Sequence, residues 1–345
     1  MRNARTGVAM LGAGAIAEYH LAGLAAAGGA DVRVIAGRSL EKTRALAERF
    51  GIPEATDDVG AAIARNDVEA VIVATPDDTH EAIAVAAARA GKAALVQKPM
   101  AGSVAAAERI VAEGERCGVD LQVSFMHRFF DEVIEASRWL AEHRLGRVLS
   151  ASIRNATPGP DWGDWFYRRD RVPNGVVDQL GVHGIDLVQH LLGRVRSVNA
   201  RARTALPRRV LADGREIDVS TVDNATALYT LDDGALVTHE MSLTESAGCD
   251  RFSMAIYGTR GTLLLRSPRG RFAVWVPERS GREWSVPSLP EAPLGARQHE
   301  AWLAGVARDG VRLSTARDAL SGMRVVEAVM RSSAGDGASV EVIAG

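Results

Sequence analysis

Short apolar runs alternate with amphipathic segments along the first third of the chain. The apolar runs predict β-strands at 6–12, 31–37, 68–75, 92–97 and 119–125. Apolar residues at helical spacing predict helices at 14–27, 40–50, 79–90 and 104–117, and Asp78 and Glu81 are spaced as a capping pair for the third of these. Strands separated by helices are typical of a parallel sheet covered on both faces. Residues 1–124 are therefore predicted to form a doubly wound dinucleotide-binding (Rossmann) domain of the α/β class.

The pattern changes beyond residue 125, where strand alternation and turn signals dominate. A helix is expected at 132–142, followed by strands at 147–156, 221–230, 235–243, 252–257, 262–265 and 272–276. The turn sequences at 232–234 and 258–261 predict hairpins. Helical spacing returns from Ala316 to Met330. Residues 125–345 are therefore predicted to form an α+β domain with a largely antiparallel, open sheet. Its exposed face suits a dimer contact, and its C-terminal helices pack back on the core.

Composition narrows the class of protein. A chain of 345 residues with 47% hydrophobic residues is expected to hold two globular domains. The net charge of -2, with both signs interspersed, argues against a nucleic-acid partner. Arg89 and Lys92 interrupt the most apolar region, and no signal peptide precedes the first strand, so a cytoplasmic protein without membrane spans is expected. Cys117 and Cys249 lie far apart and form no CxxC, which favours reduced thiols.

The first predicted strand ends in a glycine-rich turn with the pattern G-x-G-x-x-A. Gly12 allows the tight turn, Gly14 lets a pyrophosphate approach the backbone, and Ala17 lets the helix pack near the strand. The free N–H groups at the helix start, at Ala15 and Ile16, would bind the phosphates. A plain glycine turn is the alternative, but the strand before it and the helix after it favour nucleotide binding.

The second strand ends in Gly37-Arg38-Ser39, where an NAD-binding fold usually has an acid for the ribose hydroxyls. An acid would repel a 2′-phosphate, whereas Arg38 and Ser39 would bind it. This favours NADP, with NAD as the alternative. In the competing interpretation Ser39 only caps the next helix and Arg38 is only solvated.

The ends of later strands carry further candidates. Thr75, Pro76 and His80 follow the third strand at the carboxyl edge of the sheet and would border the cofactor, although Pro76 is also a common loop residue. Gln97 and Lys98 follow the next strand beside the expected nicotinamide. Lys98 could orient a substrate hydroxyl and stabilise its alkoxide, while a solvated charge is the ordinary alternative.

A helix predicted at 179–192 carries polar residues on one stripe, namely Gln179, His183, Asp186 and His190. A neutral His183 could take a hydroxyl proton as hydride leaves, although a histidine among apolar residues is often a hydrogen-bonded core residue. No metal site is predicted, because the stripe extends over two turns and no fourth ligand is apparent. The preceding loop holds aromatic and cationic residues suited to sugar faces and hydroxyls, or else is pinned to the core by its tryptophans; these are Trp162, Trp165, Tyr167, Arg168 and Arg169.

Together these motifs resemble the Gfo/Idh/MocA oxidoreductase family. The segments that carry the resemblance are 12–17, 74–76 with His80, 97–99, 125–129, 180–186, 258–262 and 318–320. The resemblance implies reversible hydride transfer between a nicotinamide and a hydroxyl-bearing carbon of a sugar, polyol or cyclitol. It implies that Lys98 orients the hydroxyl and that His183 is the general acid/base. His127, Arg128 and Asp186 would join Trp165 and Arg168 in binding substrate, and a homodimer or homotetramer would form through the C-terminal sheet.

The chain departs from the family pattern at three positions. Asp77 stands for an asparagine and Gln97 for an acid, and Gln179 occupies the place four residues before the histidine where the family often has aspartate. Either Asp178 reaches the site from an irregular helix start, or the base works without a carboxylate. Two other functions remain open at this stage. One is redox-neutral cleavage or epimerisation of sugars with tightly held NAD, and the other is a non-catalytic nicotinamide-binding regulator, against which the presence of Lys98 and His183 argues.

Overall fold

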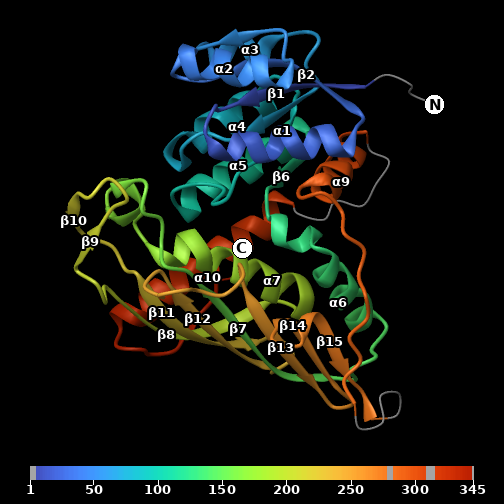
Figure 1. Cartoon of the computed structure of the whole chain (residues 1–345), viewed down its shortest axis with the longest axis vertical. Coiled ribbons are helices and arrows are strands. Elements are labelled where there is room, and N and C mark those ends of the chain that lie inside the picture. Colours follow the sequence, from blue (N-terminus) through green and yellow to red (C-terminus); the bar gives the residue numbers. More distant parts are fainter. Residues whose placement is uncertain (1–4, 278–282, 308–314, 344–345) are drawn as a thin grey trace. The chain divides into compact units, whose positions relative to one another are not determined.

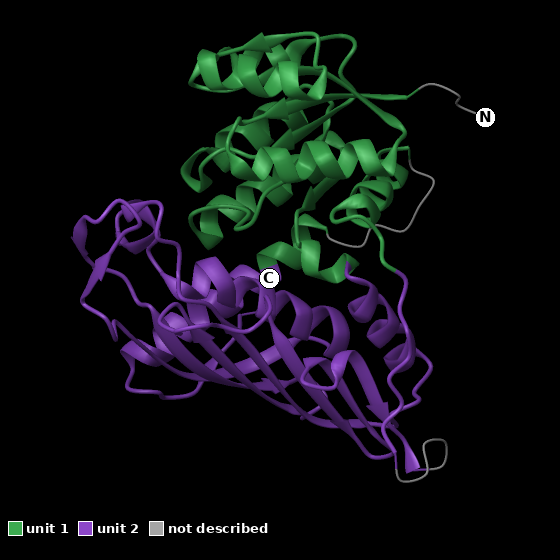
Figure 2. Cartoon of the chain, in the orientation of Figure 1, with its two compact units in different colours: residues 1–129, 291–320 green, residues 130–290, 321–345 purple. Residues whose placement is uncertain are grey.

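The computed structural model describes residues 5–277, 283–307 and 315–343 (Figure 1). Contacts divide the chain into two compact units (Figure 2), one of Met1–Phe129 with Glu291–Leu320 and the other of Phe130–Pro290 with Ser321–Gly345. The sequence had suggested a single division after residue 124, and the contacts group a late segment with the first unit. Within the described ranges, no helix has both the length and the apolar character needed to cross a membrane.

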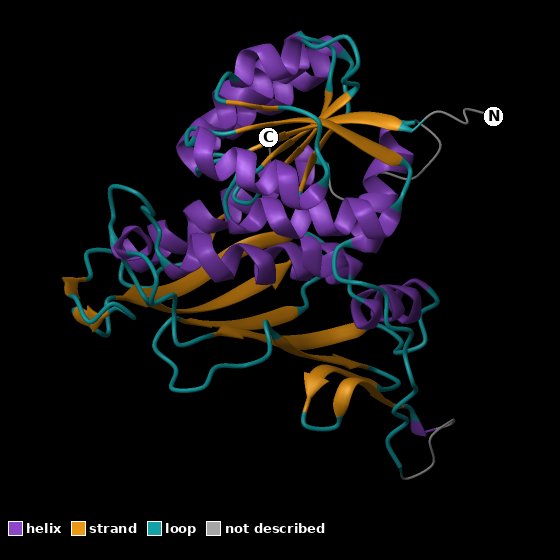
Figure 3. Cartoon of the chain, turned by 45° about the horizontal axis from the view of Figure 1, so that its top comes forward, coloured by secondary structure: helices purple, strands orange, loops and turns teal. Residues whose placement is uncertain are grey.

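In the first unit, the described residues form a six-stranded sheet with the order β3-β2-β1-β4-β5-β6, and every neighbouring pair is parallel. The strands are β1 (Thr6–Leu11), β2 (Ala30–Ala36), β3 (Ala55–Thr56), β4 (Ala70–Val73), β5 (Ala93–Val96) and β6 (Leu121–Val123). The helices around it are α1 (Ala15–Ala27), α2 (Leu40–Phe50), α3 (Val59–Ala64), α4 (His80–Arg89), α5 (Val104–Cys117) and α9 (Ala296–Val306) (Figure 3). The predicted Rossmann domain is confirmed. The strand order reverses beside β1, so a ligand crevice is expected at the carboxyl ends of β1 and β4.

The core of the first unit explains why a late segment of the chain belongs to it. The sheet residues Met10, Ile72 and Leu95 are buried in a cluster that also contains Trp302 of α9. A fully buried tryptophan removes a large apolar surface from water and stabilises this docking by roughly 2–3 kcal/mol. The docking of α9 therefore completes the core of the nucleotide unit.

Local capping agrees with the sequence at some helix starts and differs at one. The side chains of Ser39, Asp58 and Ser103 each accept a backbone hydrogen bond at the start of α2, α3 and α5. The capping pair predicted at Asp78 and Glu81 is wrong. A 3-10 turn, Asp77–Thr79, leads into α4 without a side-chain cap, and Glu81 instead pairs with Arg109 of α5.

In the second unit, the described residues form an eight-stranded sheet with the order β15-β14-β13-β7-β12-β11-β8-β16. The strands are β7 (Val148–Ala156), β8 (Val195–Arg203), β11 (Asn224–Leu231), β12 (Leu236–Ser242), β13 (Ser253–Gly258), β14 (Thr262–Ser267), β15 (Gly270–Trp275) and β16 (Val340–Glu341). Only β7 and β12 pair in parallel among these neighbours, and β9 (Arg208–Val210) and β10 (Glu216–Asp218) form a separate hairpin. The predicted hairpins β11–β12 and β13–β14 and the largely antiparallel sheet are confirmed.

Helices lie on one face of this sheet: α6 (Asp131–Ala141), α7 (Val182–Leu192) and α10 (Ala316–Ala334) (Figure 3). Alternate residues of β11 and β12 point the other way, and Leu228, Leu236 and Tyr257 of that face are exposed. The open face predicted from the sequence is therefore present, and its pairing with another copy of the chain remains a proposal.

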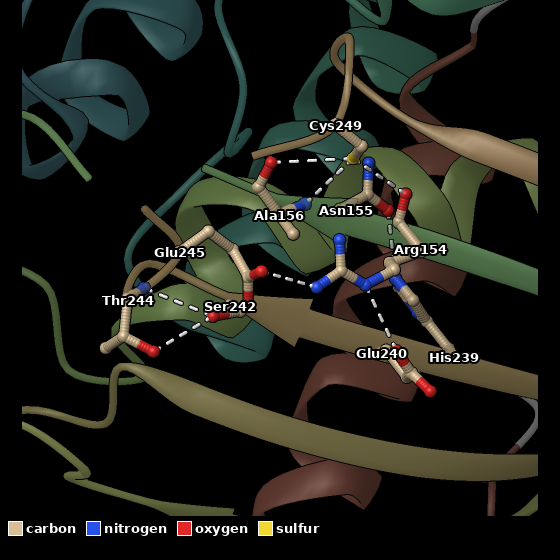
Figure 4. A network of polar contacts seen from close by, with 9 residues as sticks. All are labelled: Arg154, Asn155, Ala156, His239, Glu240, Ser242, Thr244, Glu245 and Cys249. Atoms are coloured by element: carbon tan, nitrogen blue, oxygen red, sulfur yellow. Dashed lines mark hydrogen bonds and ion pairs between the residues drawn. The ribbon is translucent and has the colours of Figure 1, made fainter. Parts of the chain in front are cut away.

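The helix α7 lies directly on a buried polar chain of the sheet. His239 donates to Asn155 Oδ1 over 2.9 Å, and its other ring nitrogen lies 2.9 Å from the hydroxyl of Tyr229. Figure 4 shows Asn155 and His239 among the polar contacts of β7 and β12. A Cβ added at Gly184 of α7 would lie 2.3 Å from Asn155 Oδ1 and 2.5 Å from the His239 ring. Only glycine permits this approach, and it sets the height of α7 above the sheet.

We predict that Gly184→Ala lowers the free energy of unfolding by about 1–3 kcal/mol, because the added methyl group overpacks this contact. Gly322→Ala in α10 is the matched control, since the nearest atom to its Cβ would be 3.8 Å away. That substitution should raise stability by about 0.5–1 kcal/mol through lower chain entropy. Urea unfolding of both variants measures the difference. Equal stability of the Gly184→Ala variant and the wild type would contradict the close contact.

Candidate nucleotide and substrate site

The turn after β1 leaves the start of α1 open. Gly12 adopts a φ of +119°, and a Cβ there would lie 2.2 Å from the carbonyl oxygen of Ala74. Gly14 is the N-cap residue of α1 and makes no side-chain cap bond, and a Cβ on it would meet nothing within 4 Å. Helix N–H groups without a cap favour an anion, so the first turn at Ala15 and Ile16 could hold a diphosphate.

The end of β2 has no room for the acid that NAD-binding folds usually carry. A Cβ at Gly37 would lie 2.7 Å from Thr43 Oγ1 and 3.2 Å from Ala13 Cβ. Ser39 accepts a 3.4 Å hydrogen bond from Lys42 N, so it does cap α2. Arg38 is exposed and makes no ion pair within the part of the chain that the structure describes. Its guanidinium is therefore available to a 2′-phosphate.

His80 ties together the loops that follow β4 and β5. Its side chain is fully buried, with Nδ1 2.9 Å from the carbonyl oxygen of Pro99 and Nε2 2.9 Å from that of Thr75. The Thr79 hydroxyl donates to Thr75 Oγ1 over 2.7 Å. His80 thus holds the backbone of the two loops at the carboxyl edge, where Pro76 is exposed.

Lys98 follows β5 by two residues, at the same carboxyl edge. Burial raises the pKa of the Asp77 carboxyl, and the charges of His80 and Lys98 oppose that rise, so Asp77 and Lys98 are electrostatic neighbours. The chain contains only three lysines. Lys42 lies on α2, and Lys92 donates to the carbonyl oxygens of Arg65 and Val68 at the opposite end of the sheet. Because lysine is rare in this sequence, a lysine at the carboxyl edge of the sheet is a further indication that Lys98 is functional.

The regular helix that carries His183 begins later than the sequence predicted. Val177–Gly181 forms a π-type turn in which the N–H of Val182 reaches the carbonyl oxygen of Val177, and α7 begins at Val182. The single helix predicted from Gln179 is therefore wrong at its start. Because hydrogen bonds in such a turn span five residues, the residue one turn before His183 shifts from Gln179 toward Asp178.

The side chains of this turn have specific partners. The amide of Gln179 donates to the carbonyl oxygen of Phe166 over 2.7 Å, which ties the preceding loop to the turn. The carboxylate of Asp178 accepts from the backbone N–H of Asn174 at 3.1 Å and from its side-chain amide at 3.2 Å. His183 and Asp186 are buried within α7. Gln179 is therefore a loop anchor, and Asp178 is the acid of this turn.

The loop before this turn, residues 162–169, was expected either to face a sugar or to be anchored in the core. It has exposed rings and one anchoring residue. Tyr167 is fully buried, and its hydroxyl donates to the carbonyl oxygen of Pro160 over 2.7 Å. Trp162 and Trp165 are 66% and 42% exposed, and the Trp165 ring stacks on that of Phe166 with centroids 3.6 Å apart. The tyrosine pins the loop while the tryptophans face outward. Arg168, nearby, pairs with Asp170 on the surface.

His127 and Arg128 lie in a 3-10 turn, Met126–Phe129, and both side chains are buried. The guanidinium of Arg128 forms an ion pair with Asp318 over 3.3 Å and lies over the Phe125 ring at 5.8 Å. These two residues are thus built into the first unit, close to the late segment that returns to it.

Sequence reasoning missed a set of polar residues at the contact of α1 with α9. Tyr19 donates to Gln298 over 2.6 Å, and Gln298 donates to Ser124 Oγ at the end of β6 over 3.0 Å. His20 and His299 also meet there, 3.0 Å apart. These partners are separated by 174 to 279 residues, so no local pattern could have paired them. Across the described ranges, no group of three or more His, Cys, Asp or Glu residues is arranged to hold a metal ion.

Comparison with known proteins gives matches along most of the chain. Residues 6–125 match the family described as "Oxidoreductase family, NAD-binding Rossmann fold", and residues 133–264 match the "GFO/IDH/MocA C-terminal domain". Inositol 2-dehydrogenase 2 of Saccharopolyspora erythraea is 30% identical over 346 residues, which cover 97% of this chain and 95% of that protein. Levoglucosan dehydrogenase of Pseudarthrobacter phenanthrenivorans is 26% identical over 257 residues, covering 69% of this chain and 65% of that protein.

A solved structure of levoglucosan dehydrogenase, in complex with NADH and L-sorbose, superposes with a TM-score of 0.89 at 21% identity. The match covers 99% of both chains. At this level of identity the likeness supports the fold of both units.

The buried histidines predict a loss of stability in acid. Burial lowers the pKa of His239 to about 3 and that of His299 to about 4 from the usual 6.5. Below pH 6.5 the unfolded chain binds a proton at each ring and the folded chain does not, so the free energy of unfolding falls with pH. The slope is about 1.4 kcal/mol per pH unit for each histidine.

Thermal melts across this range measure the effect. Tm should be nearly constant above about pH 7 and should fall steadily from about pH 6.5 to pH 4.5. A Tm that is the same at about pH 5 and pH 7.5 would show that these histidines are not held neutral.

Proposed function

Because this chain belongs to the GFO/IDH/MocA family of NAD-binding oxidoreductases, we propose that it transfers a hydride between a nicotinamide, preferably NADP, and a sugar, polyol or cyclitol. It is a dehydrogenase that acts on CH–OH groups, as its named relatives are. The observation that carries the proposal is the carboxyl edge of the parallel sheet. There the uncapped start of α1 and the amine of Lys98 follow β1 and β5, two strands of one sheet.

The residues divide the chemistry between binding and proton transfer. The backbone at Gly12, Gly14, Ala15 and Ile16 binds the diphosphate of the dinucleotide. When bound, the nicotinamide supplies the hydride acceptor. Lys98 donates a hydrogen bond to the reacting hydroxyl oxygen and stabilises the negative charge that develops on it.

His183 accepts the hydroxyl proton as the C–H hydride leaves and returns it in the reverse direction. The alcohol is thereby oxidised to a carbonyl, with the hydride passing to the nicotinamide and the proton to His183. The π-type turn brings Asp178 toward the position that Gln179 would hold in a regular helix. There the Asp178 carboxylate would favour the protonated form of the His183 imidazole.

The cofactor preference follows from the end of β2. The crowding at Gly37 leaves no place for a ribose-binding acid, and Arg38 offers a fork of donors to a 2′-phosphate. Ser39 adds a hydroxyl while it caps α2. Thr75, Pro76, His80 and Gln97 would shape the nicotinamide half of the site from the ends of β4 and β5.

The substrate would meet side chains suited to a polyhydroxylated ring. Trp165 offers an exposed ring face, and Arg168, His127, Arg128 and Asp186 offer hydrogen bonds. Inositol and levoglucosan dehydrogenases among the relatives support a carbohydrate-like substrate. We also propose that the open face of the C-terminal sheet joins copies of the chain into a dimer or tetramer.

The cofactor preference can be tested by fluorescence titration with NADPH and NADH. Wild-type protein should bind NADPH at least about tenfold more tightly, the equivalent of one charge-assisted contact of roughly 1.4 kcal/mol. Arg38→Ala should remove that preference by weakening NADPH alone. Arg44→Ala, which removes an exposed charge from α2, the helix that follows Arg38, is the control and should leave the ratio unchanged. Equal binding of NADH by the wild type would make Arg38 only a helix-start residue.

Catalytic roles can be tested with sugar and polyol panels and NADP⁺. His183→Gln and Lys98→Arg should each lower kcat by roughly 10²–10⁴-fold and leave the Kd for NADPH within a few-fold. Lys92→Arg, at the opposite end of the sheet, should retain kcat. Full activity of either site variant would remove that residue from the proposed chemistry.

A further inference from the structure

A buried pair of histidines joins α1 to α9 beneath the carboxyl edge of the sheet. His20 Nδ1 lies 3.0 Å from His299 Nε2, and His299 Nδ1 lies 2.7 Å from the carbonyl oxygen of Gly295. Both side chains are fully buried. Gly23 of α1 makes room for the pair, because a Cβ there would lie 2.4 Å from His299 Nδ1.

The carbonyl oxygen of Gly295 fixes which nitrogens of the two histidine rings carry hydrogen. A carbonyl oxygen only accepts, so Nδ1 of His299 carries the hydrogen and Nε2 of a neutral His299 accepts from His20 Nδ1. Burial lowers the pKa of both rings, which keeps them neutral. The remaining nitrogen, His20 Nε2, is then a buried lone pair that requires a donor.

The side chain of Gln97 lies at this open end, close enough to His20 to act on the pKa of its ring. His20 Nε2 and Gln97 Oε1 are both buried, and within the described residues neither atom has a hydrogen-bond partner. Since His20 Nε2 can only accept, a Gln97 amide turned with its NH2 group toward it supplies the missing donor. A carboxylate at position 97 has no hydrogen to offer, so an amide matches the neutral pair and an acid does not.

The residue after Gln97 is Lys98. Lys98 lies in the bend that follows β5, so a fixed Gln97 side chain restrains the peptide bond from which Lys98 continues. On the far side of Lys98, the carbonyl oxygen of Pro99 is held by His80 at 2.9 Å. The residue on each side of Lys98 therefore lies close to a buried histidine, Gln97 to His20 and Pro99 to His80.

We infer that His20, held in place by His299, is a positioning residue for Lys98: it fixes the Gln97 amide and with it the peptide from which Lys98 projects. This inference rests on the role proposed for Lys98. A parallel relay supports it, because Tyr19, Gln298 and Ser124 link α1 and α9 to the end of β6 in the same way. The late segment thus anchors the ends of β5 and β6 as well as covering the core.

Two substitutions of His20 separate its contact with His299 from its contact with Gln97. His20→Asn keeps a donor near the Nδ1 position for His299 but does not reach Gln97. His20→Gln places an amide oxygen near the Nε2 position for Gln97 but gives up the bond to His299. Both remove one buried hydrogen bond, and both should lower Tm by similar amounts.

Their kinetics should differ if His20 positions Lys98. We expect His20→Asn to lower kcat by about tenfold or more, with KM and the Kd for NADPH within about twofold, because misplacement affects the transition state. His20→Gln should recover kcat to within about threefold of the wild type. Equal losses of kcat in the two variants, in step with Tm, would overturn the inference.

A second measurement is independent of the substrate. Reductive methylation with ¹³C-formaldehyde labels the three lysines, and Lys98→Arg assigns the Lys98 NMR signal. His20→Asn should shift that signal and its titration, His20→Gln should restore them, and Lys42 and Lys92 should stay unchanged. An unmoved Lys98 signal in His20→Asn would overturn the inference. If the wild type oxidises no sugar or polyol, the proposed function fails, and this signal still decides the relay.

Discussion

Parallel pairing of β1 with both β2 and β4 is the constraint on which the first unit depends. It brings the carboxyl ends of all the strands to one edge and reverses the direction of winding beside β1. The glycine turn, the Arg38 position and Lys98 are far apart in sequence, and this edge gathers them. Gly12 tolerates the resulting crowding because it has no Cβ to collide with Ala74.

A second constraint comes from the docking of α9 on α1. Trp302 supplies the apolar part of that contact, while His299 bonds to His20 and Gln298 donates a hydrogen bond to Ser124. An apolar contact alone would fix α9 without fixing the strand ends. The polar side chains make the contact directional, because a hydrogen bond forms only over a narrow range of distance and angle. The neutral state of His20 gives a physical reason for an amide at position 97, where the family pattern has an acid.

The second unit applies the same principle to α7. Gly184 lets the helix lie against the Asn155–His239 pair, so a buried polar contact sets its distance from the sheet. Before it, a π-type turn changes the register between Asp178 and His183, and Gln179 becomes the anchor of the aromatic loop. In both units, a buried histidine therefore lies close to the chain neighbour of a candidate catalytic side chain. His80 contacts Pro99, which follows Lys98, and His239 lies against Gly184, which follows His183.

The sequence by itself determined the Rossmann domain, the antiparallel half and the family, because the apolar periodicity, the glycine turn and the hairpin signals are local. It also singled out Lys98 and His183 by motif. Tertiary structure decided the rest. The capping pair at Asp78 and Glu81 failed because Arg109, on another helix, takes Glu81, and the helix at Gln179 starts irregularly where Gly181 and Gly184 pack on the sheet. The link from His20 to His299 spans 279 residues. Buried polar partners are chosen by proximity in space, and only the folded chain creates that proximity.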